Sequence, residues 1–156
     1  MTFSDLPEQF IHTRTYRWVV FRCYFYPDKI NKVPYHPRGY KASIDNKETW
    51  SNFESCMKAI QFGIGHLPGY AITKESHVGC VDLDHCILED GSFTSTAVKY
   101  MERFKDHAYM EKSVSGKGIH IFFWYTGKDC PPTHPEPGVE VYTDGRFIAI
   151  TGDVIG

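Results

Sequence analysis

Hydrophobic and polar positions alternate in short runs along most of the chain, and the first run predicts a strand. Residues 15–26 hold tyrosine, tryptophan, valine and phenylalanine in close succession and end at Pro27-Asp28, a composition typical of a strand followed by a turn. A second extended stretch is predicted around residues 70–72. Between them, residues 32–39 contain prolines that predict an extended loop.

A third apolar run begins at Val78 and predicts a buried strand that carries two acids. Side chains two apart on a strand share a face, so Asp82 and Asp84 are predicted to point the same way, away from Val81 and Leu83. Two like charges held together are costly unless a cation neutralises them, and a hard divalent ion prefers oxygen ligands. The alternative is a strand that runs out into solvent, because Asp-x-Asp also occurs at strand ends.

Two amphipathic helices are predicted from apolar positions at helical spacing. Asp45 can cap the first helix, with Glu48 completing a capping box, and its apolar stripe is Trp50, Phe53, Met57 and Ile60. The second is capped near Ser92 or Thr94, and its stripe is Ala97, Met101 and Phe104. Alternating strands and helices predict an α/β core.

Residues 109–124 predict two strands joined by a tight turn that contains Ser115-Gly116-Lys117. Small residues in the turn expose backbone N–H groups, which together with Ser115, Lys117 and His120 could form a nest for a triphosphate. Taken alone, Ser-Gly-Lys-Gly is also a good hairpin turn. His120 is equally well explained as a core histidine whose hydrogen bonds are satisfied.

The dipeptide Asp144-Gly145 is the strongest short hairpin signal in the chain. A two-residue turn there would place Glu140 opposite Ala149, so that a carboxylate would face a small neighbour and leave room for an ion. Arg146 would lie at the base of the hairpin, either as an exposed turn residue or as a phosphate contact.

Composition adds a charge asymmetry to this picture. The 156 residues carry a formal net charge of −2, yet residues 14–47 contain eight basic and two acidic side chains. This split suits a basic rim that handles phosphates and an acidic centre that holds metal, although ordinary surface lysines give the same count. Five cysteines, an odd number without Cys-x-x-Cys spacing, predict reduced thiols. No signal peptide or membrane-spanning run is apparent, so the expected location is the cytoplasm of the host cell.

The order of three motifs resembles that of a known family. An Asp-x-Asp strand (Asp82, Asp84), a Ser-x-x-x-x-His segment (Ser115, His120) and an acid between hydrophobic residues (Glu140) follow one another as in the archaeo-eukaryotic primase superfamily. In particular, the chain is similar to the primase-polymerase domain at the N-terminus of phage and plasmid replication proteins. The likeness runs from about residue 16 to residue 152, including 18–21, 32–34, 42–43, 49–50 and 146–152.

The resemblance implies a role for each motif. Asp82, Asp84 and Glu140 would be the catalytic residues and would hold two divalent ions, Mg²⁺ or Mn²⁺. The nucleoside triphosphate would be bound by Ser115, Gly116, Lys117, His120 and Arg146. Lys32 and Arg38 are candidates for contacts to the single-stranded DNA template or primer. The implied activity is template-directed nucleotidyl transfer by a DNA primase or DNA polymerase.

The resemblance also implies an architecture. Residues 1–156 are expected to form a single catalytic domain of α+β class, with a mixed sheet and an RNA-recognition-like C-terminal half. Such domains form the N-terminal part of longer proteins and often work with a helicase, so full activity is expected to need a further region. Two alternatives stay open. One is a metal-dependent nuclease, which the same carboxylates would serve; the other is a non-catalytic nucleotide- or DNA-binding module that recruits a replication partner.

Overall fold

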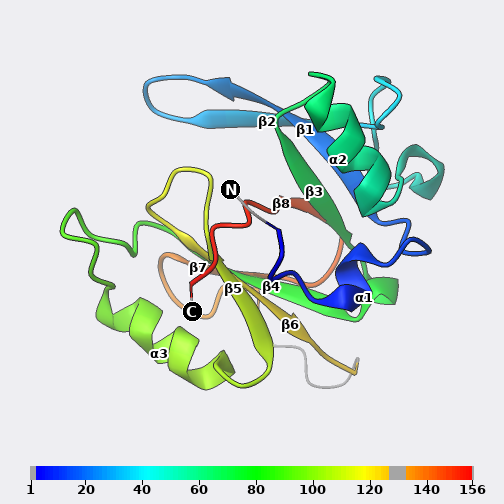
Figure 1. Ribbon diagram of the computed structural model, residues 1–156. Helices are drawn as coiled ribbons and strands as arrows, with labels where there is room; N and C mark the ends of the chain where they lie inside the picture. The colour runs from blue at the N-terminus through cyan, green and yellow to red at the C-terminus, as the bar shows by residue number, and fades with distance from the viewer. Residues whose placement is uncertain (1–2, 127–132, 156) are drawn as a thin grey trace. The chain divides into compact units, whose positions relative to one another are not determined.

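The computed structural model describes residues 3–126 and 133–155 and confirms the α+β class. In this part of the chain three α-helices accompany two four-stranded sheets, with strand orders β2-β1-β3-β8 and β5-β6-β4-β7 (Figure 1). The chain divides into two compact units, which we describe separately. Unit 1 comprises Met1–Asp5, Ile72–Asp144 and Thr151–Gly156, and unit 2 comprises Leu6–Ala71 and Gly145–Ile150.

Unit 2 is built on the first sheet. Its strands are β1 (Trp18–Phe25), β2 (Ile30–Tyr35), β3 (Leu67–Ile72, whose last residue belongs to unit 1) and β8 (Arg146–Ala149). Strand β1 pairs antiparallel with both β2 and β3. The expected loop at residues 32–35 is therefore wrong: these residues belong to β2, which pairs with β1. Pro34 is tolerated because β2 lies at the edge of the sheet.

Three helical segments precede β3 in unit 2: α1 (Glu8–Ile11), a 3₁₀ turn (Lys47–Thr49) and α2 (Phe53–Gln61). The predicted cap at Asp45 is wrong, since the helical stretch is broken at Trp50 and Ser51. Asn46 caps the 3₁₀ turn, and the Asn52 side chain caps α2 by accepting from the backbone N–H of Ser55 at 2.9 Å. Asparagine serves as well as aspartate at this position.

The two faces of the first sheet have separate cores, as period-two alternation requires. On one face the fully buried Trp18 of β1 packs edge-on against Phe53 of α2 and Tyr70 of β3, with ring centroids 4.8 and 5.3 Å away. On the other face Val19 and Ala71 pack with Trp50. This sheet therefore buries apolar side chains on both sides.

Unit 1 contains the second sheet. Its elements are a 3₁₀ turn (Lys74–Ser76), β4 (Val78–Leu83), α3 (Ser95–Phe104), β5 (Ala108–Lys112), β6 (Ile119–Trp124) and β7 (Val139–Tyr142). All three ladders, β5–β6, β6–β4 and β4–β7, are antiparallel. Helix α3 follows β4, and β6 lies between β4 and β5 in the sheet. This is the split βαβ arrangement of ferredoxin-like folds. The predicted cap of α3 is confirmed at Thr94.

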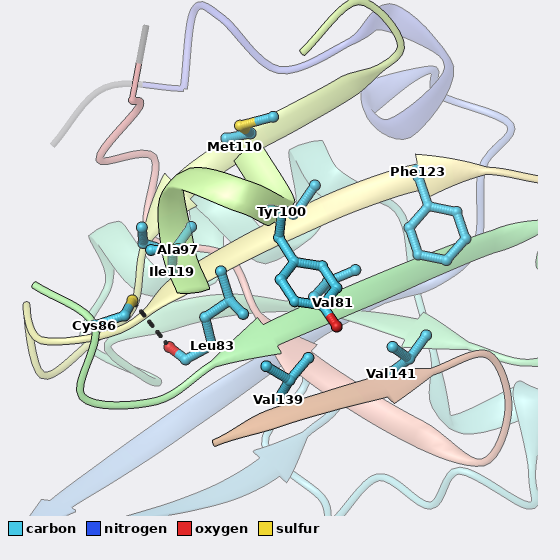
Figure 2. Close-up of a cluster of buried hydrophobic side chains, with 11 residues drawn as sticks. Val81, Leu83, Cys86, Ala97, Tyr100, Met110, Ile119, Phe123, Val139 and Val141 are labelled. Atoms are coloured by element: carbon cyan, nitrogen blue, oxygen red, sulfur yellow. Dashed lines mark hydrogen bonds between the residues drawn. The ribbon is translucent and has the colours of Figure 1, made fainter. Parts of the chain in front are cut away.

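Helix α3 covers one face of this sheet. Figure 2 shows Ala97 and Tyr100 of the helix lying over Val81 and Leu83 of β4. The same cluster includes Ile119, Ile121, Phe123, Val139 and Val141, all buried. Every second residue of β4, β6 and β7 is thus used for packing, and the residues between them point to the opposite face.

The hairpin predicted at Asp144-Gly145 is wrong. The chain does turn there, with Gly145 at φ 67°, but β7 joins the second sheet and β8 joins the first. Glu140 consequently lies opposite Asp82 of β4 rather than opposite Ala149. Pairing with the buried strand β4 outweighs the local turn signal, because it lets Val139 and Val141 reach the core beneath α3.

No helix within residues 3–126 and 133–155 is long and apolar enough to cross a membrane. The four cysteines in this range, Cys23, Cys56, Cys80 and Cys86, are buried free thiols, as predicted. Cys130 lies outside the described residues.

Candidate active site

A row of polar side chains crosses the second sheet on the face away from α3. Glu111 of β5 pairs with His120 of β6, His120 with Asp82 of β4, and Asp82 with Glu140 of β7. Directly opposite residues in antiparallel strands project to the same face. Backbone register alone therefore brings together two predicted catalytic acids, the predicted histidine and one further acid.

Glu111 is the buried end of this row. Its side chain is 0% exposed, yet both carboxylate oxygens have several partners. It accepts hydrogen bonds from the Tyr109 hydroxyl at 3.0 Å and from the backbone N–H groups of Thr151 and Gly152 at 2.8 and 3.3 Å. One of its oxygens also lies 3.4 Å from Nδ1 of His120. The carboxylate thus joins β5, β6 and the C-terminal segment.

His120 lies between two carboxylates and is itself buried. Its Nδ1 faces Glu111, and its Nε2 lies 3.8 Å from Oδ1 of Asp82. The Glu111 contact orients the ring, so that Nε2 is directed along the row toward Asp82. His120 is therefore held as a core histidine would be, while one nitrogen still faces the partly exposed end of the site.

Asp82 and Glu140 form the accessible end of the row. Both are half-buried, and the Asp82 side chain is 23% exposed. Glu140 accepts a hydrogen bond from the hydroxyl of Tyr142, two residues along β7. Like charges directly opposite on adjacent strands repel each other, so this pair favours a cation between them.

The donor set fits a hard divalent ion, because carboxylate oxygens are the ligands that Mg²⁺ and Mn²⁺ prefer. Asp84 is less tightly placed than predicted. Strand β4 ends at Leu83, and Asp84 follows it as an exposed residue whose N–H donates to the carbonyl of Gly138 at 3.0 Å. Across the described ranges, no three His, Cys, Asp or Glu side chains gather closely enough to form a ready-made ligand cluster.

The turn between β5 and β6 lies one residue beyond the row. Gly116 adopts φ 75°, and its N–H donates to the carbonyl of Ser113 at 2.9 Å. The N–H of Lys117 donates to the Ser115 hydroxyl, and that of Gly118 to the Ser113 hydroxyl. These three amides bond within the turn, so they do not form the open backbone nest that the sequence suggested, whereas the side chains of Ser115 and Lys117 are exposed.

The acids of the row affect neighbouring groups on the same face. Burial raises the pKa of the Cys80 thiol well above its ordinary value, and the charges of Asp82 and Glu111 raise it further. The pKa of Tyr109 is also raised, by burial first and then by Glu111. The charges of Asp82 and Glu111 therefore act on neighbouring side chains across this face of the sheet.

The other predicted site residues belong to unit 2, and their predicted roles stay predictions. Lys32 is exposed on β2, Arg38 is exposed in the turn that follows it, and Arg146 is the exposed first residue of β8. Two other basic residues of this region, Arg17 and Arg22, each donate a hydrogen bond to a main-chain carbonyl. They donate to the carbonyls of Ala71 and Ile64, both at 2.9 Å.

Sequence reasoning missed Glu111. A lone acid on a strand has no motif around it, and its importance depends on a partner nine residues away and on a segment forty residues away. One signal was available: in a strand, Glu111 shares a face with Tyr109, and the apolar Met110 between them points to the other face.

Comparison with known proteins adds a relative. No protein-family model matches the chain. The chain is 30% identical over 152 residues to a protein named DNA primase-polymerase from the Nitratiruptor phage NrS-1, a match that covers 91% of this chain. The chain spans about a fifth of the length of that relative, of which 20% is covered. The similarity supports a relationship to the primase-polymerase family.

Proposed function

We propose that this chain is the nucleotidyl-transfer core of a primase-polymerase of the archaeo-eukaryotic primase superfamily. The observation that carries the proposal is the row formed by Glu140, Asp82 and His120, which lie opposite one another on three adjacent strands. The similarity to the phage DNA primase-polymerase supports it independently.

In this proposal the two facing carboxylates hold the divalent ions. Asp82 and Glu140 contribute oxygens from the sheet, and Asp84 contributes from the end of β4. When bound, Mg²⁺ or Mn²⁺ would activate the 3′-hydroxyl and stabilise the pyrophosphate leaving group. Without an ion, two like-charged carboxylates face each other on adjacent strands, and a bound cation would relieve their repulsion.

The side chains beside the acids bind the incoming nucleoside triphosphate. His120 presents Nε2 next to Asp82, and the Lys117 ammonium extends from the neighbouring turn. Both would offset phosphate charge, which increases on the leaving group during transfer. Ser115 is exposed beside Lys117 and can donate its hydroxyl hydrogen to a phosphate oxygen. Pairing with the template selects the base, so no side chain needs to read it.

A calorimetric titration tests the proposal. A nucleoside triphosphate with Mn²⁺ is titrated into the wild-type chain, into Asp82→Ala/Asp84→Ala and into Asp106→Ala, a control that removes an exposed acid after α3. We expect metal-dependent binding to the wild type and the control and none to the double variant. A folded wild-type chain that does not bind would refute the proposal.

A primer-extension assay then tests the reaction. Incorporation of a templated nucleotide supports transfer. Cleavage of the primer without incorporation would instead favour the nuclease alternative, because the same carboxylates can serve hydrolysis.

A further inference from the structure

The β1–β2 hairpin of unit 2 extends beyond the sheet from which it starts (Figure 1). Strand β1 pairs with β3 through Trp18–Phe21. Its pairing with β2 continues to Phe25, and the Tyr26 N–H still donates to the Lys29 carbonyl at 2.9 Å. The inner half of the hairpin is therefore paired with β3 along the edge of β1, and the outer half is not paired with β3.

One face of this hairpin carries aromatic rings interleaved with cations. By register, Arg22 and Tyr24 of β1 share a face with Tyr35 of β2, and the pair Tyr26 and Lys29 continues it at the turn. The Arg22 guanidinium lies 4.1 Å from the ring centroid of Tyr35, and the Lys29 ammonium lies 5.7 Å from that of Tyr26. Such contacts hold the rings and the cations next to one another.

The outer rings of this face remain open to solvent. Tyr24 is 45% exposed and Tyr26 is 52% exposed. The exposed part of each ring gives the fold no stabilisation from burial of apolar surface. Neither β1 nor β2 contains an acidic residue, and Asp28 lies in the turn between them. The charged residues that the register assigns to this face are the cations Arg22 and Lys29. The face is thus both aromatic and positive.

We propose that the face formed by Arg22, Tyr24, Tyr26, Lys29 and Tyr35 is a stacking platform for single-stranded DNA. Bases of a single strand can stack on aromatic rings while interleaved cations follow the phosphates. A duplex cannot use such a platform, because its bases are already stacked on each other. The choice of DNA rests on the proposed function, which requires an unpaired template; the platform itself rests on the hairpin.

This assignment separates the platform from Lys32, one of the two basic residues proposed for DNA contacts from the sequence. Lys32 pairs with Cys23 and therefore lies on the opposite face of the hairpin, which it shares with Phe25. Phe25 is 69% exposed. The hairpin thus supplies a matched control, an exposed aromatic side chain one residue from Tyr24 but on the other face.

Fluorescence anisotropy with a labelled oligothymidine tests the platform. We expect Tyr24→Ala and Tyr26→Ala each to weaken binding at least about fivefold, and Tyr24→Phe, which keeps the ring, to bind as the wild type does. Phe25→Ala is expected to retain wild-type affinity. A larger loss for Phe25→Ala than for the tyrosine variants would place the strand on the other face and overturn the proposal.

An abasic strand of equal length distinguishes stacking from charge. It keeps the phosphates and lacks the bases, so the wild type should bind it more weakly than oligothymidine. Tyr24→Ala/Tyr26→Ala should bind the two strands equally, and Lys29→Ala should bind both more weakly with a shallower salt dependence. An equal loss on both strands for the double tyrosine variant would show that the rings only support the hairpin, and would refute stacking.

The oligothymidine experiment tests the platform separately from the row of polar side chains in unit 1. If the wild-type chain binds oligothymidine but does not bind a nucleoside triphosphate with Mn²⁺, the proposed function is refuted and the platform is retained. Retained nucleotide binding with no oligothymidine affinity would refute the platform alone.

Discussion

Replacing Glu111 should have the largest effect on stability among the acids of the row. Glu111→Ala removes the acceptor for two buried backbone N–H groups, those of Thr151 and Gly152, and for the Tyr109 hydroxyl. A buried donor left without a partner costs about 1–3 kcal/mol. Removing one member of a buried charged network typically costs about 3–5 kcal/mol, and we expect a loss in that range.

Glu111→Gln should cost less, about 1–3 kcal/mol, because it keeps the volume and one acceptor oxygen. Its amide –NH₂ would then face either a backbone N–H or the His120 ring, which also offers a donor or an acceptor. The order of stability should therefore be wild type, Glu111→Gln, Glu111→Ala. Urea unfolding followed by circular dichroism measures all three free energies of unfolding.

The matched control is Glu102→Ala on α3. The Glu102 side chain is 68% exposed and pairs with Lys105 at 2.7 Å, and an exposed pair of this kind contributes about 0.5 kcal/mol or less. A Glu111→Ala variant that loses no more than this control would refute the argument, because it would show that water or a shifted segment satisfies the Thr151 and Gly152 amides.

Three further perturbations follow from the described structure. Gly79→Ala should destabilise the fold by about 1–3 kcal/mol, because a Cβ there would overlap the Phe123 ring, and adding Phe123→Leu should recover part of the loss in urea unfolding. Burial raises the pKa of the Cys56 thiol from 9.0 to about 12. The stability linked to this thiol is present below pH 9 and is lost as the pH rises toward 12, so the free energy of unfolding should fall over this range. Cys56→Ala should make that fall smaller. Glu140→Gln should raise stability in EDTA by about 0.2–1 kcal/mol by relieving repulsion with Asp82, and should abolish stabilisation by Mn²⁺ in a thermal unfolding assay.

Local patterns predicted much of unit 1. The apolar run that begins at Val78 and the serine- and glycine-rich turn within residues 109–124 predicted the strands that carry Asp82 and His120. Period-two geometry also predicted that Asp82 points away from Val81 and Leu83. The turn between β5 and β6 and the helix capped by Thr94 were equally local. Each of these features depends on residues within a few positions of one another, and a single sequence contains that information.

Long-range pairing was not predictable in the same way. Asp144-Gly145 is a good hairpin turn, and nothing nearby in the sequence shows that β7 instead pairs with β4. The free energy that decides between these pairings comes from packing beneath α3, which joins residues from 81 to 141. The role of Glu111 was not predicted for the same reason, because its backbone partners are about forty residues away in the sequence.

The apolar face of the second sheet determines the chemistry of its polar face. Val139 and Val141 pack beneath α3 together with Val81 and Leu83, and this packing sets the register between β7 and β4. A slip of one residue would turn both valines away from the core and move Glu140 to the helix side, so the register is strongly favoured. Asp82 and Glu140 are consequently kept opposite each other despite their repulsion. Core packing outweighs the cost of about 0.2–1 kcal/mol for two facing like charges, and it thereby maintains a pair of carboxylates whose repulsion a cation would relieve.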